Sequence, residues 1–330
     1  MAAPVSAAHG TQALIYKKPR IRQSFISRTL PFWLLLPTLL VLAAIQFYPG
    51  IYSFFLSTQT FQAGKQIFNG TRNFSRVFNS GTFSDSVFIT LFFLVGYALL
   101  TLAAAFAIAL FLNRRLRLSG AYLTLIFIPW VLSDVIVGLI FRLFIVPDYG
   151  LLAPFFANPF LFGAPNGISI LTTPQPIPII PGVPFPPAPA LLLLIFASAW
   201  KAVPFTTLLI LAALQTVPRE VLESSSIDGA NGFNSFRFIT FPLVLPTLVV
   251  ALFNLSLTGI NGVGMIFSLT SGGPGTATET LSYLLYTIGF GDLDFGKAAA
   301  LSVFMAIINL ALILLALRIS RTDRDQVERT

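Results

Sequence analysis

Six long apolar stretches constrain the fold of this chain more than any other feature of its sequence. A helix needs roughly 20 predominantly apolar residues to cross a bilayer. The stretches cover residues 31–57, 84–112, 121–146, 189–216, 241–270 and 297–318. Only 10% of the 330 residues are charged, against about 25% in an ordinary soluble domain, so the chain could not cover a water-facing surface. The sequence therefore predicts an all-α membrane protein with six transmembrane helices in a lipid bilayer.

The basic residues fall mostly on one side of these predicted spans. With the N-terminus in the cytoplasm, the cytoplasmic segments carry 14 Lys and Arg residues and the external loops carry four. Basic residues collect on cytoplasmic loops, so the asymmetry predicts a multi-pass protein of the bacterial cytoplasmic (inner) membrane with both termini in the cytoplasm. It also accounts for the net charge of +8 without nucleic acid as a partner.

The remaining segments divide the chain into parts. Residues 1–30 form a basic cytoplasmic tail, residues 31–318 the transmembrane domain, and residues 319–330 a second cytoplasmic tail. Residues 147–189 hold twelve of the 23 prolines and a single charge, Asp148. Because proline interrupts helices, this segment is predicted to be an extended external loop. It serves either as a spacer over the outer mouth or as a docking surface for an external partner.

The sequence offers little of the chemistry that enzymes and metal sites use. Cysteine is absent, and the single histidine, His9, lies in the polar N-terminal tail. A phosphate-binding loop needs glycine-rich backbone followed by lysine and then serine or threonine. None of the five lysines is followed by either residue. We therefore expect no catalytic residue, no metal and no cofactor on this chain, and any ATP would be hydrolysed by another polypeptide.

The longest internal cytoplasmic segment, residues 217–240, has the pattern of a short helix with a defined start and end. Pro218 suits a first helical turn, where its missing N–H costs nothing. Glu220 and Glu223 follow in the early turns, where a negative charge is favourable against the helix dipole. Gly229 ends the helix because glycine readily takes a positive φ.

A second short segment follows, with Phe233, Phe236 and Ile239 spaced for one apolar face, until Pro242 opens the fifth span. Two short helices at an angle would make a compact cytoplasmic surface for another protein.

This loop carries a resemblance to a known family. It contains Glu223-Ser224-Ser225, Ile227-Asp228-Gly229-Ala230 and Ile239-Thr240-Phe241-Pro242. These match the spacing of a Glu-Ala-Ala, Asp-Gly-Ala and Ile-x-Leu-Pro signature, with serines for both alanines and phenylalanine for leucine. The signature is that of the binding-protein-dependent ABC importer permeases, in the sugar and glycerol-phosphate branch that includes the maltose-type subunits. Further similar motifs are Ile128-Pro129-Trp130, Trp200-Lys201, Ala212-Ala213-Leu214-Gln215 and Ser271-Gly272-Gly273-Pro274.

The resemblance implies a type I ABC importer permease architecture with a cytoplasmic coupling helix. The chain would form half of a translocation path for a sugar or related polyol. The implied partners are a second homologous permease subunit, an ATP-binding-cassette ATPase dimer that holds ATP and Mg, and an extracytoplasmic substrate-binding protein. The residues that would couple to the ATPase are Glu220, Glu223, Asp228, Gly229, Ala230 and Pro242.

The fifth predicted span has the polar groups expected of a transport path. Asn254, Thr258 and Asn261 place hydrogen-bonding groups where unsatisfied polar atoms are costly. Gly259 and Gly262 allow close approach of another helix. In the family the corresponding stretch contacts sugar, so the resemblance implies substrate contacts here. Helix packing is the alternative role for each of these residues.

Three ionisable residues, Asp134, Arg142 and Lys201, lie within or beside the predicted spans, where charges are usually functional or paired. Asp134 is expected to pair with one of the two bases, and binding of substrate is the alternative.

Two other classes of protein fit this sequence less well than an importer subunit. A secondary transporter predicts coupling acids in mid-membrane and internal repeats, and the sequence shows neither. A membrane-embedded enzyme with a lipid-soluble substrate would need a cluster of acids, histidine or cysteine. The close carboxylate pair between the fifth and sixth predicted spans, Asp292 and Asp294, is equally well explained by a turn before the last span.

Overall fold

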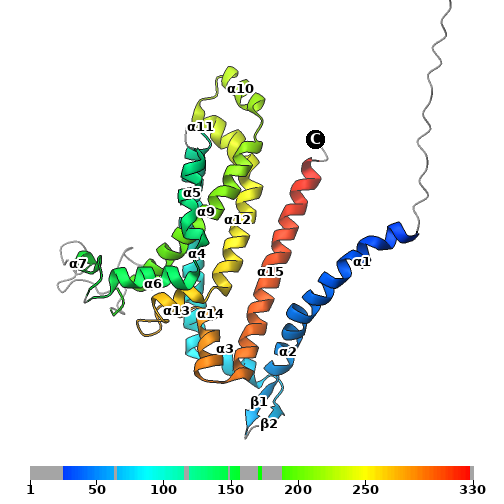
Figure 1. Ribbon diagram of the computed structural model, residues 1–330, viewed down its shortest axis with the longest axis vertical. Helices are drawn as coiled ribbons and strands as arrows, with labels where there is room; N and C mark the ends of the chain where they lie inside the picture. The colour runs from blue at the N-terminus through cyan, green and yellow to red at the C-terminus, as the bar shows by residue number, and fades with distance from the viewer. Residues whose placement is uncertain are drawn as a thin grey trace, which may run out of the picture. The chain divides into compact units, whose positions relative to one another are not determined.

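The computed structural model describes residues 25–62, 65–114, 119–147, 149–156, 170–172 and 188–327 (Figure 1). Most of the predicted basic tail, most of the proline-rich loop with Asp148, and residues 328–330 lie outside these residues. The chain divides into two compact units between Tyr52 and Ser53. The first unit is an apolar helical segment that comprises α1 (Phe25–Leu42), the π-helix η1 (Ala43–Phe47) and the start of α2 (Tyr48–Ser57).

Within the described residues, five helices are long and apolar enough to cross a membrane, and a bent pair makes up to six. The five are Phe32–Ser57, Gly81–Leu112, Pro189–Thr216, Gly232–Asn261 and Phe295–Ile319. The bent pair occupies the position of the third predicted span. The prediction of an all-α, multi-span membrane fold is thus confirmed.

The third predicted span, residues 121–146, is not one helix, and in this detail the sequence-based expectation is wrong. α5 (Ser119–Val131) and α6 (Asp134–Ile145) meet at an angle of 91°. Ser133 has an extended backbone and its Oγ accepts a hydrogen bond from the Ile136 amide at 3.3 Å. Serine is a favoured N-cap, so a new helix begins here although both sides are apolar.

The fifth predicted span, residues 241–270, also differs at both ends. The helix already begins at Gly232 and passes through α11 (Gly232–Ser235) and the π-helix η2 (Phe236–Thr240) into α12 (Phe241–Asn261). Pro242 therefore lies inside a continuous helical segment and does not open it. Pro242 has no backbone N–H to donate. In the wider π turn just before it, the Phe241 amide donates to the Phe236 carbonyl.

At its other end the fifth span stops earlier than predicted. α12 ends at Asn261, Gly262 is extended, and a separate short helix α13 (Gly264–Leu269) follows. The chain then turns through Gly272, which has φ +80°, and enters α14 (Leu281–Tyr286) and the π-helix η3 (Thr287–Gly291). The last span is α15 (Phe295–Val327).

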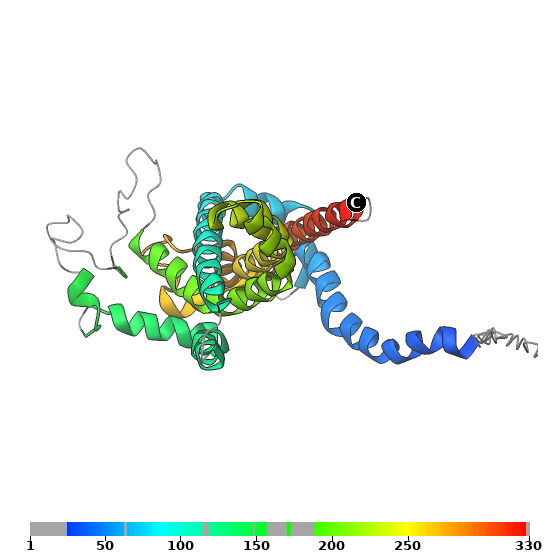
Figure 2. The same ribbon diagram turned by 90° about the horizontal axis from the view of Figure 1, so that it is seen from above.

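The core of the second unit forms where α4 (Gly81–Leu112) packs along α9 (Pro189–Thr216), which lie side by side in Figure 2. Small residues dominate the buried side of α4, among them Ala98, Thr101, Ala105 and Ala109. Small residues let two helix backbones approach closely in a membrane. A Cβ added at Gly96 would lie 2.9 Å from Ile195 Cδ1, so the two helices are already in close contact.

One end of the second unit carries a small element that the sequence did not predict. β1 (Gln59–Gln62) and β2 (Lys65–Phe68) form an antiparallel hairpin that is followed by α3 (Arg72–Phe78). Buried Asn73 ties them together, because its Nδ2 donates to the carbonyls of Ser57 at 2.9 Å and Gln59 at 2.7 Å. Arg76 pairs with Asp294 at 2.7 Å, so α3 is fastened to the turn before α15.

Short helices complete the described part of the chain. α7 (Ala153–Phe156) follows the bent pair, and α10 (Arg219–Ile227) occupies the predicted cytoplasmic loop. In Figure 1, α10 lies at one end of the second unit and the β1–β2 hairpin at the other. The long helices α4, α9 and α12 run between these two ends.

Candidate functional site

A cavity of about 180 Å³ opens among α4, α5, α6, α9, α12 and α13. Its walls combine aromatic, polar and charged side chains, which include Tyr97, Trp130, Asp134, Lys201, Phe205 and Asn254. A concave site with apolar walls and a few convergent polar groups is the usual form of a small-molecule site. We therefore take this cavity as the candidate site.

The cavity lies where the break between α5 and α6 meets the break between α12 and α13. α6 begins at Asp134 beside it, and α13 contributes Met265 and Ile266 to its wall. In Figure 1, α6 and α13 run side by side across the direction of α4, α9 and α12. Their contact depends on small residues, because a Cβ added at Gly138 would overlap Ser268 Oγ, and one added at Gly264 would lie 3.2 Å from Asp134 Cβ.

An ion pair spans the cavity wall between α6 and α9. Lys201 Nζ lies 2.7 Å from Asp134 Oδ1, and the side chains are 22% and 48% exposed. The predicted pairing of Asp134 with a base is thus confirmed, with Lys201 as its partner. Arg142 instead makes a long contact of 3.5 Å from Nη1 to the Ser268 carbonyl.

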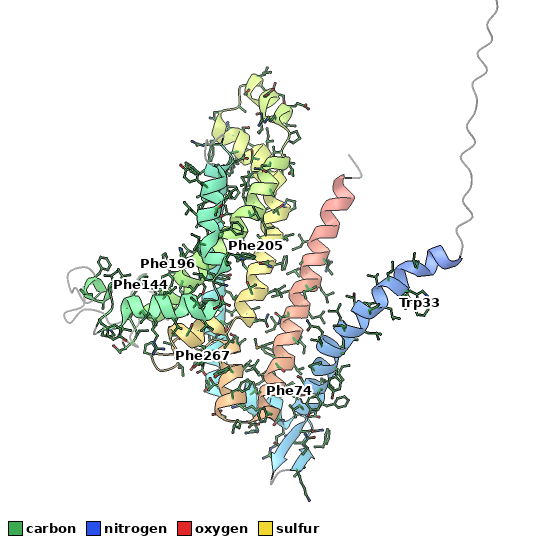
Figure 3. The ribbon with its side chains drawn as sticks, in the orientation of Figure 1. Trp33, Phe74, Phe144, Phe196, Phe205 and Phe267 are labelled. Carbon is green, nitrogen blue, oxygen red and sulfur yellow. The ribbon has the colours of Figure 1, made fainter. Side chains whose placement is uncertain are left out.

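Two pairs of parallel aromatic rings also line the cavity. Trp130 of α5 stacks on Phe205 of α9, with ring centroids 5.7 Å apart and planes 10° apart; Phe205 is labelled in Figure 3. Phe93 and Tyr97 of α4 stack in the same way, at 5.5 Å and 4°. An aromatic ring has a flat apolar face with a partial negative charge, so these rings offer flat surfaces to a ligand.

Of the five residues predicted to line a transport path, four line this cavity: Asn254, Thr258, Gly259 and Gly262. Gly259 also has a packing role, because a Cβ there would lie 2.6 Å from Leu94 Cδ2 of α4. The sequence reasoning did not assign Tyr97 or Phe93 to the site, because an aromatic residue inside an apolar run gives no signal of its own.

Asn261 is the exception among the five, because it joins α12 to α15. Its Nδ2 donates to Asn309 Oδ1 at 3.2 Å, and Asn309 Nδ2 donates back to Asn261 Oδ1 at 3.0 Å. The same Asn261 Nδ2 also reaches the Leu257 carbonyl at 2.7 Å. In this structure Asn261 acts in helix packing.

The polar residues of α12 form an exposed stripe. Asn254, Thr258 and Asn261 are spaced i, i+4 and i+7, which places them on one face of the helix, and all three are exposed. Exposed polar groups within a span are costly against lipid and usually face a polar path or another protein. Asn309 of α15 is the polar neighbour for Asn261, whereas Asn254 and Thr258 are left open at the cavity.

The predicted coupling helix is present as α10, with a well-formed C-terminal end. Gly229 has φ +83°, its amide donates to the Ser226 carbonyl at 3.2 Å, and the Ala230 amide donates to the Ser225 carbonyl at 2.9 Å. These two bonds define a Schellman motif, which needs a left-handed residue at the position of Gly229. Asp228 occupies the C-cap position immediately before it.

The surface of α10 is largely uncovered. Glu220 and Glu223 are exposed, and the apolar Ile227 is 85% exposed. The helix is fixed to α11 from its other side, where Ser225 Oγ and Ser235 Oγ lie 3.1 Å apart. Pro242, the last residue of the predicted coupling set, lies beyond this surface in α12.

Comparison with known proteins places these features in a family. The family described as the binding-protein-dependent transport system inner membrane component matches residues 102–322, a range that includes α9, α10, α12 and α13. The sn-glycerol-3-phosphate transport system permease protein UgpA of Agrobacterium fabrum is 32% identical, with 87% of this chain and 93% of that protein covered. The trehalose/maltose transport system permease protein MalF of Thermococcus litoralis is also 32% identical, with 90% and 95% covered.

Among solved structures, the fold is similar to a chain of a bacterial ABC transporter involved in the import of the acidic polysaccharide alginate. The TM-score is 0.70 at 24% sequence identity, and the match covers 90% of this chain and 97% of that chain. A second structure of the bacterial alginate transporter, in complex with an alginate pentasaccharide-bound periplasmic protein, matches with the same TM-score. The similarity extends over nearly the whole length of both chains.

Proposed function

The chain belongs to the family of binding-protein-dependent transport system inner membrane components, and we propose that it forms half of the path of an importer for a sugar or related polyol. It is a multi-pass inner membrane protein. The observation that carries the proposal is the cavity at the two helix breaks, together with the exposed polar stripe of α12 beside it. A second homologous permease subunit would supply a polar neighbour for the open part of this stripe, at Asn254 and Thr258.

The energy for import would come from a separate ATP-binding-cassette ATPase dimer that holds ATP and Mg. α10 supports this assignment, because it is a short helix with a fixed C-terminal end and an uncovered surface. A rigid, exposed helix can transmit the movement of a bound partner to the spans that flank it. We assign Glu220, Glu223, Asp228, Gly229 and Ala230 to this contact, and Pro242 to the connection into α12.

The opposite end of the second unit, with the β1–β2 hairpin, would face the outside. The excess of basic residues on the α10 side supports this orientation, with both termini in the cytoplasm. An extracytoplasmic substrate-binding protein would deliver the substrate to the external end. The relatives named for glycerol phosphate and for trehalose and maltose support a small polyhydroxylated substrate.

Purification of the chain in a mild detergent, followed by identification of the proteins that accompany it, tests the assembly. We expect an ATPase and a second permease subunit. In cells that express the whole assembly, Glu223→Lys and Gly229→Pro should abolish ATP-driven uptake. Asp85→Lys makes the same charge change at an exposed residue near the start of α4 and should leave uptake intact. Absence of an ATPase, together with full uptake by both loop variants, would refute the proposal.

A further inference from the structure

We propose that the Asp134–Lys201 ion pair sets the charge selectivity of the cavity, so that this half of the path accepts an uncharged polyhydroxylated substrate and disfavours a phosphorylated one. The inference rests on the proposed function and narrows its substrate class. It concerns the cavity itself and not the substrate-binding protein, which makes a separate selection.

Among the residues that the structure describes, those that line the cavity carry no net charge. Asp134 and Lys201 are the charged residues among them, and their side chains meet at 2.7 Å. The other lining residues are aromatic, aliphatic, thioether, amide or hydroxyl side chains and glycines. A site for a phosphate would instead be expected to present an uncompensated cation, because charge-assisted bonds from Arg or Lys are the usual means of phosphate recognition.

The exposure of the two partners further disfavours an anion. The Asp134 side chain is 48% exposed, whereas that of Lys201 is 22% exposed. A phosphate that approached the ammonium group would therefore come close to the more accessible carboxylate. Like charges repel more strongly in a low-dielectric interior than in water, and the phosphate would lose hydration without a free cation in return.

The same pair suits a substrate with many hydroxyl groups. Each hydroxyl can donate to the Asp134 carboxylate or accept from the Lys201 ammonium, and hydrogen bonds to an ionised group are stronger than neutral ones. Asn254 and Thr258 of α12 add neutral donors and acceptors to the lining of the cavity. The stacked rings of Trp130 and Phe205 provide a flat apolar surface for the less polar face of such a molecule.

The backbone of the two broken spans fixes the position of the Asp134 carboxylate. Asp134 occupies the first turn of α6, where the helix dipole favours a negative charge. Gly264 of α13 lies directly against it, so a larger residue there would push the carboxylate away. The pair is thus built into the junction of the two broken spans.

Fluorescence of Trp130 gives a direct test in the intact complex. The chain would be purified with its partner subunits in lipid nanodiscs, without the binding protein, and Trp33→Phe and Trp200→Phe would leave Trp130 as the only tryptophan of this chain. Maltose should change its fluorescence saturably, and sn-glycerol-3-phosphate should bind at least about tenfold more weakly, since a like-charge contact is strongly unfavourable. A complex that carries Trp130→Phe gives the fluorescence of the tryptophans in the partner subunits, and this signal is subtracted.

Substitutions of the pair should move this preference in a defined direction. Asp134→Asn frees the ammonium and should shift the ratio of the two affinities toward sn-glycerol-3-phosphate by about tenfold or more. The exchange Asp134→Lys with Lys201→Asp restores neutrality and should restore the preference for maltose. Asp85→Asn removes a carboxylate outside the cavity and should leave the ratio unchanged.

Three results would overturn the inference. They are equal binding of the two ligands by the unmodified cavity, an unchanged ratio in Asp134→Asn, and no response of Trp130 to either ligand. Each leaves the proposed function standing if the complete assembly still imports solute with ATP. Failure of the assembly to import any solute would instead count against the proposed function.

Discussion

Replacement of Gly138 by alanine tests the contact between α6 and α13 on which the site depends. The new Cβ would overlap Ser268 Oγ, and it would lie 3.0 Å from Ser268 Cβ and 3.1 Å from the Met265 carbonyl oxygen. Overpacking of a tight contact costs about 1–3 kcal/mol. The higher helix propensity of alanine than of glycine offsets up to about 1 kcal/mol of this cost.

The overpacking cost at this position lies in the upper part of the range of about 1–3 kcal/mol. Ser268 Oγ is held by a hydrogen bond to the Gly264 carbonyl at 2.8 Å, so it cannot rotate away without the loss of that bond. Gly138→Ala should therefore lower the free energy of unfolding by about 1–2 kcal/mol after the gain in helix propensity. It should also weaken ligand binding, because Asp134 lies one helical turn before Gly138 and moves with α6.

The free energy of unfolding can be measured by titration of the purified protein in detergent micelles with sodium dodecyl sulfate. Gly120→Ala in α5 is the matched control, since a Cβ there meets nothing within 4 Å, and it should be neutral or stabilising. Ser268→Ala removes the overlapped oxygen, so the double variant should recover at least about 0.5 kcal/mol relative to additivity. A Gly138→Ala variant as stable as Gly120→Ala would show that α6 and α13 do not pack as described.

Three further predictions concern other parts of the chain. Asn261→Leu should cost about 1 kcal/mol of unfolding free energy, because two interhelical amide bonds are lost, and a double-mutant cycle with Asn309→Leu should show the coupling. Gly229→Ala should cost about 1–2 kcal/mol, because φ is +83°, and Gly229→Asn should cost less in the same unfolding titration. Burial, and then the charge of Asp292, raise the pKa of Glu279, which lies outside the candidate spans. The pKa of Glu279 is higher in the folded protein than in the unfolded chain, so the protonated side chain favours the folded state. Its contribution to stability is complete below the ordinary pKa of 4.5 and is lost as the pH rises through the folded pKa. Glu279→Gln should therefore raise the thermal unfolding temperature at about pH 8 and change it little at about pH 4.

The sequence predicted those features that depend on local pattern. Apolar length alone located the first, second, fourth and sixth spans. Gly229 located the end of α10, because few residues other than glycine take the left-handed conformation at a helix end. The pairing of Asp134 with a base was also accessible, since an unpaired charge within a span is costly.

Features that depend on tertiary contacts could not be predicted from the sequence. The break at Ser133 lies between two apolar segments, and apolar length does not distinguish one long helix from two short ones. Asn254 and Asn261 lie on the same face of α12, and only the position of α15 decides that Asn261 is bound to a neighbour. The aromatic walls come from α4, α5 and α9, and no local pattern relates these segments.

The two helix breaks themselves argue for a site at this position. A helix end leaves backbone groups without partners, and within a membrane such groups are tolerated only in contact with protein or a polar cavity. Here serine hydroxyls provide partners at both breaks, since Ser133 Oγ accepts from the Ile136 amide and Ser282 Oγ donates to the Gly262 carbonyl at 2.9 Å. Because neutral hydroxyls meet the needs of the backbone, the charges of Asp134 and Lys201 remain available to each other and to a substrate.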